Sequence, residues 1–506
     1  MKYLPLILPC FFFASLNGQL NTAVLQTAGT RVLINSDGTW GQSSKPALSL
    51  NQGKVQVPLL NKLSVWVSGR SGAGTLMGSF SDVFSDSSNF LPGPLGLSGA
   101  VPADPLLHDK VFTVQESEVM SHRRDFRSKT YQLPSNLMEW PANGNQGFDP
   151  VLAPYADFDQ NGKYNPAQGD YPYFSGNACA YTIANDFTGG NWKHGNTPGI
   201  EIQQLVRTFP ASGQDDQMFL IRFTVHNRSL NGYKGMRLSV AADFSIGSNG
   251  DDYLTTDVVH NALIAYNGSD SDVFLGKSAP ACALMFLNRP VGATIYFESG
   301  NDAVKGKPRR PQDFYNLARA CWKTGKPLAY GNAGLDGNNV TRFVYSNGTD
   351  PDFSGTWNEW DAANFPGRRT GVISTDSFDL PAGESIVIEA AVSLLPGIGN
   401  KPDRCKPVLD FQQKLASYQL SSAGTKKPMP VDLFSLRGFW VDIHPPRTGA
   451  PVKLEFFRLN GSRIGTYCIL NDSSFNLKNL PDLGIILLKA TSEDYTSCKL
   501  INLTTN

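Results

Sequence analysis

A chain of 506 residues is long enough for more than one buried core, because single domains usually contain roughly 100–200 residues. Its 44 Lys and Arg residues balance its 44 Asp and Glu residues, so no overall charge would attract nucleic acid or an anionic membrane surface. With 48 Gly, 33 Pro and only 17% charged residues, the composition favours a turn-rich β protein over a helical one.

The N-terminal segment has the pattern of a secretory signal peptide. Lys2 precedes an apolar run from Leu4 to Leu16, and small or polar residues follow around Gly18. About 13 apolar residues are too few to span a bilayer, which takes ~20, and no later segment approaches that length. We therefore predict a signal peptide over residues 1–18, an exported mature chain and no transmembrane segment.

Alternating apolar and polar residues recur in short runs along the body of the chain. In the run 218–227, the apolar residues between Phe219 and Val225 would share one face of a strand. Further strands are predicted at 63–69, 201–209, 236–244, 282–287 and 385–394. Few segments look helical, and the best helical patterns are at 116–126 and 407–420. The pattern predicts a mainly β fold of antiparallel β-sandwich domains with few helices.

The stretch ADFDQNGKYNPAQGDYP places oxygen-bearing side chains at alternate positions of one loop. Asp157, Asp159 and Asn161 would supply side-chain oxygens. Gly162 permits a sharp turn, and Lys163 could offer its backbone carbonyl oxygen. This spacing would let a short loop wrap oxygen ligands around a hard cation, and we predict that the cation is calcium.

The same loop departs from an EF-hand where the bidentate glutamate would stand. Gln168 occupies that position, and Asp170 follows two residues later. Pro154, Pro166 and Pro172 argue against flanking helices. We therefore predict a helix-free calcium loop closed by Asp170, and the alternative is a metal-free surface loop built from Asx-turns. The predicted ligands are Asp157, Asp159, Asn161, Lys163 and Asp170.

A second acidic group contains Asp243, Asp251, Asp252 and Asp257. It could solvate a loop, form another calcium site, or supply the carboxylate pair that glycoside hydrolysis requires. The chain has no H-E-x-x-H, G-x-S-x-G or P-loop motif to point to another chemistry. Near other glycine-rich stretches, Trp192, Trp357 and Trp360 could contact sugar rings or pack inside the fold.

Seven cysteines are present, and Cys10 falls in the predicted signal peptide. The others have long irregular spacings without a C-x-x-C motif, which argues against a zinc site or a redox motif. Cys468 and Cys498 are the favoured disulfide pair, because both lie in the last short domain of an exported chain. Buried free thiols are the alternative.

A domain boundary is predicted at the small, polar and proline-closed stretch 421–430. Before it lies a β-rich body over 19–425, which we divide into two subdomains with a boundary near 130–200. After it lies a small β domain over 432–506 with several short strand patterns.

The tail resembles the C-terminal sorting domain of the bacterial type IX secretion system. The resemblance rests on KLEFFRLNGSRIGTYCI, FNLKNLPDLGIILLKA and CKLINL. It implies a small Ig-like β-sandwich that the secretion machinery recognises, and delivery to the cell surface or the medium through the periplasm.

The body resembles a group of uncharacterised exported proteins that carry the same sorting domain. Matching stretches include RVLINSDGTW, DKVFTVQESEVMSHRRDF and APYADFDQNGKYNPAQGDYP. Since the group has no established activity, the resemblance implies export and little more. We expect a non-enzymatic calcium-binding protein of adhesion, surface layer or matrix, with a glycan or a surface protein as ligand. The rival hypothesis is a secreted polysaccharide hydrolase that uses carboxylates between 243 and 257.

Overall fold

The computed structural model describes residues 20–395, except 28, 54, 98–107, 146, 188–194, 209–217, 270 and 278; beyond 395 it describes only the strands between 434 and 502. The chain separates into two compact units, Met1–Leu415 and Ala416–Asn506. The predicted signal peptide at 1–18 and the predicted helix at 407–420 lie outside the described residues.

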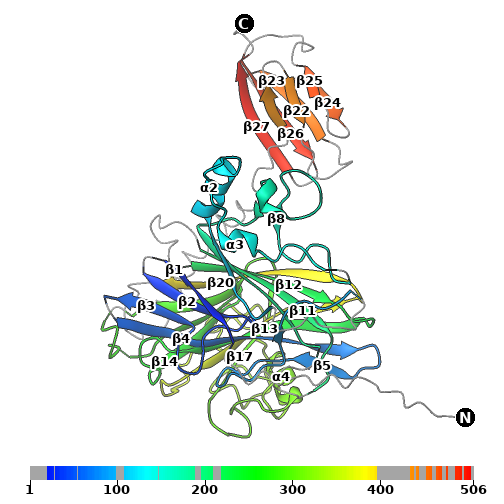
Figure 1. The fold of residues 1–506 in the computed structure, drawn as a ribbon. Coiled ribbons are helices and arrows are strands. Elements are labelled where there is room, and N and C mark those ends of the chain that lie inside the picture. The colour runs from blue at the N-terminus through cyan, green and yellow to red at the C-terminus, as the bar shows by residue number, and fades with distance from the viewer. Residues whose placement is uncertain are drawn as a thin grey trace, which may run out of the picture. The chain divides into compact units, whose positions relative to one another are not determined.

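One nine-stranded sheet of the first unit combines N-terminal strands with strands from the middle of the chain (Figure 1). It contains β1 (Thr22–Gln26), β2 (Thr30–Asn35), β3 (Leu48–Gln52), β4 (Val55–Ser71), β5 (Leu76–Ser79), β13 (Tyr233–Phe244), β17 (Val291–Phe297), β18 (Thr370–Thr375) and β19 (Phe378–Leu380). The order is β1-β2-β3-β4-β13-β18-β17, with β5 paired to β4 and β19 paired to β13.

The other nine-stranded sheet contains most of the strands that the sequence predicts. Its members are β6 (Leu91–Pro92), β7 (Phe112–Gln115), β10 (Ala178–Asn185), β11 (Ile200–Thr208), β12 (Met218–Asn227), β14 (Asp252–Asp257), β15 (Ala262–Asn267), β16 (Ala281–Phe286) and β20 (Ser385–Leu395). The order is β14-β15-β16-β20-β12-β11-β10-β6, with β7 paired to β10. The predicted mainly β, antiparallel, sandwich-like fold is confirmed.

Helices are few in the described part of the chain, and they follow ordinary capping rules. They are α2 (Glu116–Asp125), α3 (Ser135–Met138), α4 (Pro311–Leu317) and the short 3-10 helix η1 (Pro166–Gln168). The predicted helix at 116–126 is α2. Its first turn carries acidic residues and its last turn basic ones, which suits the helix dipole. Glu118 Oε2 also accepts the Gln115 N–H, a capping contact.

The second unit contains only strands among its described residues. These are β21 (Phe434–Arg437), β22 (Trp440–Ile443), β23 (Val452–Arg458), β24 (Arg463–Ile469), β25 (Ser474–Asn476), β26 (Ile485–Ser492) and β27 (Tyr495–Asn502). They form a three-stranded sheet, β21-β22-β25, and a four-stranded sheet, β24-β23-β26-β27, both antiparallel.

The predicted Cys468–Cys498 disulfide is wrong. Cys468 lies on β24 and Cys498 on β27, the two outer strands of the four-stranded sheet. Two strands separate them, and since neighbouring strands lie about 4.8 Å apart, the Cα atoms are roughly 14 Å apart. A disulfide needs Cα atoms within about 7 Å. In the first unit, Cys179, Cys282 and Cys321 are buried free thiols.

The main core lies between the two nine-stranded sheets. The alternating residues that the sequence assigns to one face of β12, from Phe219 to Val225, are fully buried there, while Arg222 faces outward. Residues of β4, β13 and β17 from the opposite sheet join the same core. Each sheet therefore covers the apolar face of the other.

A second, smaller core covers the outer face of β10 and β11. Alternate residues of β10 point to different cores: Ala178 and Ala180 join the main one, whereas Cys179 and Tyr181 join the smaller one. The smaller core also takes in Trp140 and other residues between 112 and 174. Because β10 is buried on both faces, its sequence does not alternate between apolar and polar residues.

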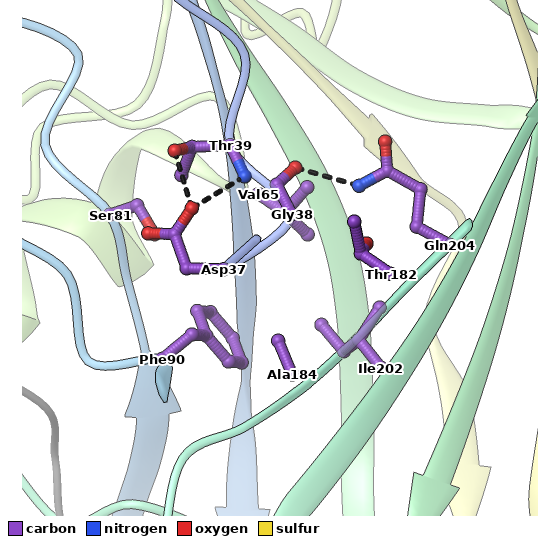
Figure 2. A pocket seen from close by; sticks show the side chains of 10 residues that line it. All are labelled: Asp37, Gly38, Thr39, Val65, Ser81, Phe90, Thr182, Ala184, Ile202 and Gln204. Carbon is purple, nitrogen blue, oxygen red and sulfur yellow. Dashed lines mark hydrogen bonds between the residues drawn. The ribbon is translucent and has the colours of Figure 1, made fainter. Parts of the chain in front are cut away.

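Buried polar groups connect the two sheets by hydrogen bonds. Gln204 of β11 donates to the Gly38 carbonyl oxygen at 2.7 Å and accepts from the Trp40 indole at 2.7 Å. Beside it, Asp37 accepts from Thr39, and its burial raises the pKa of its carboxyl group. Figure 2 shows a small cavity that Asp37, Gly38, Thr39 and Gln204 line together with other residues. Its volume of about 10 Å³ is too small for a ligand larger than water.

The segment 343–345 closes the sandwich at one side. Phe343 bridges to Thr294 on the outer edge of β17, and the Tyr345 carbonyl oxygen accepts the Thr256 N–H on the outer edge of β14. The Thr256 and Thr294 hydroxyl oxygens are 2.8 Å apart. This single segment therefore joins the edge strands of both sheets.

A buried ion pair lies at the same side of the sandwich. Glu359 is fully buried, and its carboxylate accepts the Leu254 N–H of β14 and two N–H groups of Arg369, with an Nη2–Oε2 distance of 2.7 Å. Arg369 directly precedes β18. The pair therefore links the edge strand β14 of one sheet to the start of β18, the strand next to the edge of the other sheet.

We predict that Arg369→Ala destabilises the protein by about 3–5 kcal/mol, because it leaves the Glu359 carboxylate buried without its counter-ion. Urea denaturation measures the loss. The control is Lys234→Ala, which removes the exposed Lys234–Asp379 pair and should have little effect. Equal denaturation midpoints for the two variants would contradict the prediction.

Candidate metal centre

The acidic loop lies in the layer that covers β10 and β11. Two short strands, β8 (Tyr155–Ala156) and β9 (Tyr171–Pro172), pair at its base. Inside the loop, Asn165 caps η1 by accepting the Ala167 N–H. The Gly169 that follows has a φ of 111° and packs against Phe126, so a side chain there would be strained and would clash.

Three carboxylates meet in this loop. One ligand oxygen from each of Asp157, Asp159 and Asp170 lies within 4.8 Å of the others. Asp170 is buried, Asp157 is half-buried and Asp159 is exposed, so one end of the group is anchored in the fold and the other faces solvent. No other group of three such side chains converges in this way among the described residues.

Backbone N–H groups orient these carboxylates. The Asp170 oxygens accept from Phe158 and Asn165, both at 2.7 Å. Asp157 accepts from Gly162 at 2.7 Å. Each of these oxygens keeps a second lone pair for another partner. The Asx-turn geometry that the sequence offered as the metal-free alternative is present, and it also brings the carboxylates together.

The remaining predicted ligands lie in the same loop. The Asn161 side-chain oxygen accepts the Lys163 N–H at 2.8 Å, and its amide nitrogen donates to Asp159 at 2.7 Å. Coordination by Asn161 and by the Lys163 carbonyl stays a prediction. Gln168 is not among the predicted ligands, because it stands where an EF-hand has glutamate. Its side-chain amide oxygen lies 3.4 Å from the side-chain nitrogen of Asn161. Gln168 stands three residues after Asn165, the N-cap of η1. That spacing was the sequence signal that could have placed Gln168 in the loop's hydrogen-bond network.

The electrostatics of the loop favour a bound cation. Burial raises the pKa of Asp170, and the nearby Asp157 and Asp159 carboxylates raise it further, although two backbone hydrogen bonds oppose the shift. A cation would relieve this repulsion among like charges. The donors are carboxylate and amide oxygens without thiolate or imidazole, and that set suits a hard cation such as calcium. The residues present therefore fit the predicted metal.

His122 ties helix α2 to the loop. It is fully buried, and its Nε2 lies 3.1 Å from the Asp170 carbonyl oxygen, while Nδ1 lies 3.2 Å from the Tyr131 hydroxyl. Burial lowers the pKa of this imidazole, which favours a neutral ring that donates from Nε2 and accepts at Nδ1. The buried ligand Asp170 is thus held through its backbone as well as its side chain.

The structure does not bring the four residues of the second acidic group into one cluster, although two of them, Asp251 and Asp252, lie near each other. Asp243 forms an ion pair with Arg368, and Asp257 accepts from the His260 imidazole at 2.8 Å. Asp251 accepts from a serine hydroxyl, Ser269 Oγ, at 2.9 Å. Asp252 is buried, which raises the pKa of its carboxyl group, and the nearby Asp251 carboxylate raises that pKa further. Asp252 also accepts a backbone N–H.

The three tryptophans that could contact sugars have different positions. Trp357 is buried and donates its indole N–H to the Asn332 carbonyl oxygen at 2.9 Å. It therefore packs in the main core, where a sugar cannot reach its ring. Trp360 is 39% exposed. Trp192 lies outside the described residues.

Comparisons with known proteins identify neither a family nor a function for this chain. No protein-family model matches the chain, and no curated protein matches it. Among solved structures, one similar chain is a polysaccharide lyase that is 12% identical, with a TM-score of 0.20; the match covers 60% of this chain and 34% of that one. The chain thus spans about a third of that protein's length. None of the described helices is long and apolar enough to cross a membrane.

We predict that calcium raises the melting temperature of the protein. A ligand that binds only the folded state stabilises it by about 2.7 kcal/mol at a hundredfold excess over its dissociation constant. Asp159→Ala should abolish the increase, because it removes one of the three converging carboxylates. Calorimetric melting with and without calcium measures both.

The matched control is Asp336→Ala, which removes a carboxylate that is 89% exposed and lies far from the loop in sequence. Its response to calcium should equal that of the unchanged protein. The absence of heat in a calcium titration of the unchanged protein would rule out the site.

Proposed function

We propose that this chain is an exported protein of the cell surface or its surroundings, stabilised by calcium, with a role in adhesion, surface layer or matrix. The observation that carries the proposal is the oxygen-only group of Asp157, Asp159 and Asp170. Calcium sites of extracellular modules typically have dissociation constants of about 10⁻⁴–10⁻³ M, so a partly exposed site of modest affinity is compatible with a role outside the cell.

In this proposal calcium acts on stability and not on chemistry. The loop packs with α2 through His122 and with the smaller core through Tyr155, Tyr164 and Tyr171. A cation that holds the loop would therefore also hold the layer over β10 and β11. Binding energy at such a site contributes directly to the free energy of unfolding.

The rival hypothesis of a secreted polysaccharide hydrolase has less support. Of the four carboxylates that it invokes, Asp243 and Asp257 already have charged or imidazole partners, and Asp252 is buried. A hydrolase needs two carboxylates facing one substrate across the scissile bond. Ion pairing and burial argue against that use of these residues.

We predict no turnover when the purified protein is screened against polysaccharides and peptides. Asp251→Asn and Asp252→Asn are the informative variants, because they remove the two carboxylates of the group that lack a charged partner among the described residues. Turnover by the unchanged protein that either variant abolishes would overturn the adhesion proposal in favour of the hydrolase.

For delivery, we propose that residues 432–506 are recognised by the type IX secretion machinery. Deletion of these residues should leave the protein in the periplasm, and cell fractionation measures its distribution. Full-length Asp159→Ala is the control, because it changes the body and keeps the tail, and it should be delivered normally. Surface delivery of the truncated chain would contradict the proposal.

A further inference from the structure

A surface cavity lies at the end of β17, in a part of the sequence far from the metal loop. Its volume is about 430 Å³, within the usual range of ligand sites. Three parts of the chain line it: Tyr296 with 298–300, Lys305, and 364–366 with 368–369. The second and third belong to the long connection between β17 and β18.

Lys305 brings a positive charge to this cavity. The Asp302 carboxylate lies near enough to feel that charge, but no carboxylate of the described residues forms a direct ion pair with Lys305. Its ammonium group donates to the Tyr296 hydroxyl at 2.9 Å. The same nitrogen lies 5.4 Å from the centre of the Tyr296 ring and 5.7 Å from that of Trp322. Aromatic groups therefore position the ammonium group by cation–π contact, and it keeps donors for another partner.

Arg368 supplies a second cation. Its side chain is 35% exposed, and its guanidinium group is oriented by a bidentate contact with the buried Asp243 carboxylate. The group lies 5.0 Å from the Phe84 ring centre. The Thr370 hydroxyl donates to the same Asp243 carboxylate and helps to fix its position. The carboxylate in turn orients the guanidinium, whose remaining N–H groups can donate to an anion.

Other lining residues suit a sugar. Phe365 is 90% exposed, an unusual position for a large apolar ring, and offers an aromatic face for stacking. Glu298 has no cationic partner among the described residues and could accept hydroxyl hydrogens. Asn364 is oriented by donating to the Tyr345 hydroxyl at 2.6 Å, which leaves its amide oxygen as a further acceptor.

We propose that this cavity binds an acidic saccharide, a sugar that carries a carboxylate or a sulfate group. Lys305 and Arg368 would bind the anionic group, Glu298 the hydroxyl groups, and Phe365 the face of the ring. A neutral sugar would leave the two cations without an anionic partner. A polyphosphate has no ring to stack on Phe365 and no hydroxyl groups to donate to Glu298. The inference rests on the proposed surface role and names the class of ligand for it.

The test measures binding by isothermal calorimetry with three probes: a galacturonic acid trimer, its carboxyl-reduced neutral form, and a sulfated galactose oligosaccharide. We expect at least one acidic probe to bind at least tenfold more tightly than the neutral one. Lys305→Ala should weaken that binding at least tenfold, and added salt should weaken it too. Tight binding of only one acidic probe identifies the anionic group.

Phe365→Ala should weaken binding of the acidic probe several-fold. The ring is almost fully exposed, so its removal should leave the melting temperature unchanged. Matched controls are Phe274→Ala, which removes another exposed ring, and Lys277→Ala, which removes an exposed lysine; neither lines the cavity. Both should bind as the unchanged protein does.

The inference is overturned if neither acidic probe binds, if the neutral form binds equally well, or if the control variants lose as much affinity as Lys305→Ala and Phe365→Ala. Failure here is distinguishable from failure of the proposed function. A normal calcium response and normal export without saccharide binding would refute only the cavity's role. Loss of either of those responses would instead refute the calcium or export proposal.

Discussion

Each nine-stranded sheet has an apolar face that must be kept from water, and the two sheets bury these faces by packing on each other. The rest of this unit depends on that contact. Face-to-face packing removes the buried polar groups from water, so each must find a partner inside. Gln204 of β11 bonds to Gly38 and Trp40, which follow β2 of the opposite sheet. Glu359 bonds to Leu254 of β14 and to Arg369, which precedes β18 of the opposite sheet. The specificity of the sandwich thus depends on a few polar contacts within an apolar core.

The outer layer over β10 and β11 also combines a buried apolar face with a few buried polar contacts, on a smaller scale. Its apolar residues cover a face of the sheet that would otherwise meet solvent, and the layer consists largely of loops. Loops lack the regular hydrogen bonds of a sheet, so they need local ones. Asp170 supplies them through both carboxylate oxygens and through its carbonyl group. The candidate metal centre is therefore built into the element that most needs support.

Local patterns in the sequence were enough to predict the acidic loop and six strands of the first unit, which fall in β4, β11, β12, β13, β16 and β20. The alternation in β12 and the spacing of Asp157 and Asp159 reflect periodicities that neighbouring residues carry themselves. Contacts between distant residues could not be predicted in this way. Arg368 neutralises a carboxylate 125 positions away. The cavity likewise combines residues near 300 with others near 366, and the sheet order that separates Cys468 from Cys498 is absent from any local pattern.

The closure of the sandwich by segment 343–345 has a consequence for how copies of the protein meet. An edge strand with free N–H and C=O groups can add a strand from another molecule. At β14, Leu254 and Thr256 already donate to Glu359 and Tyr345, and β17 is bridged to Phe343. A second copy would have to break these bonds before it could extend either sheet there. The occupied edges of β14 and β17 therefore disfavour edge-to-edge aggregation at this side.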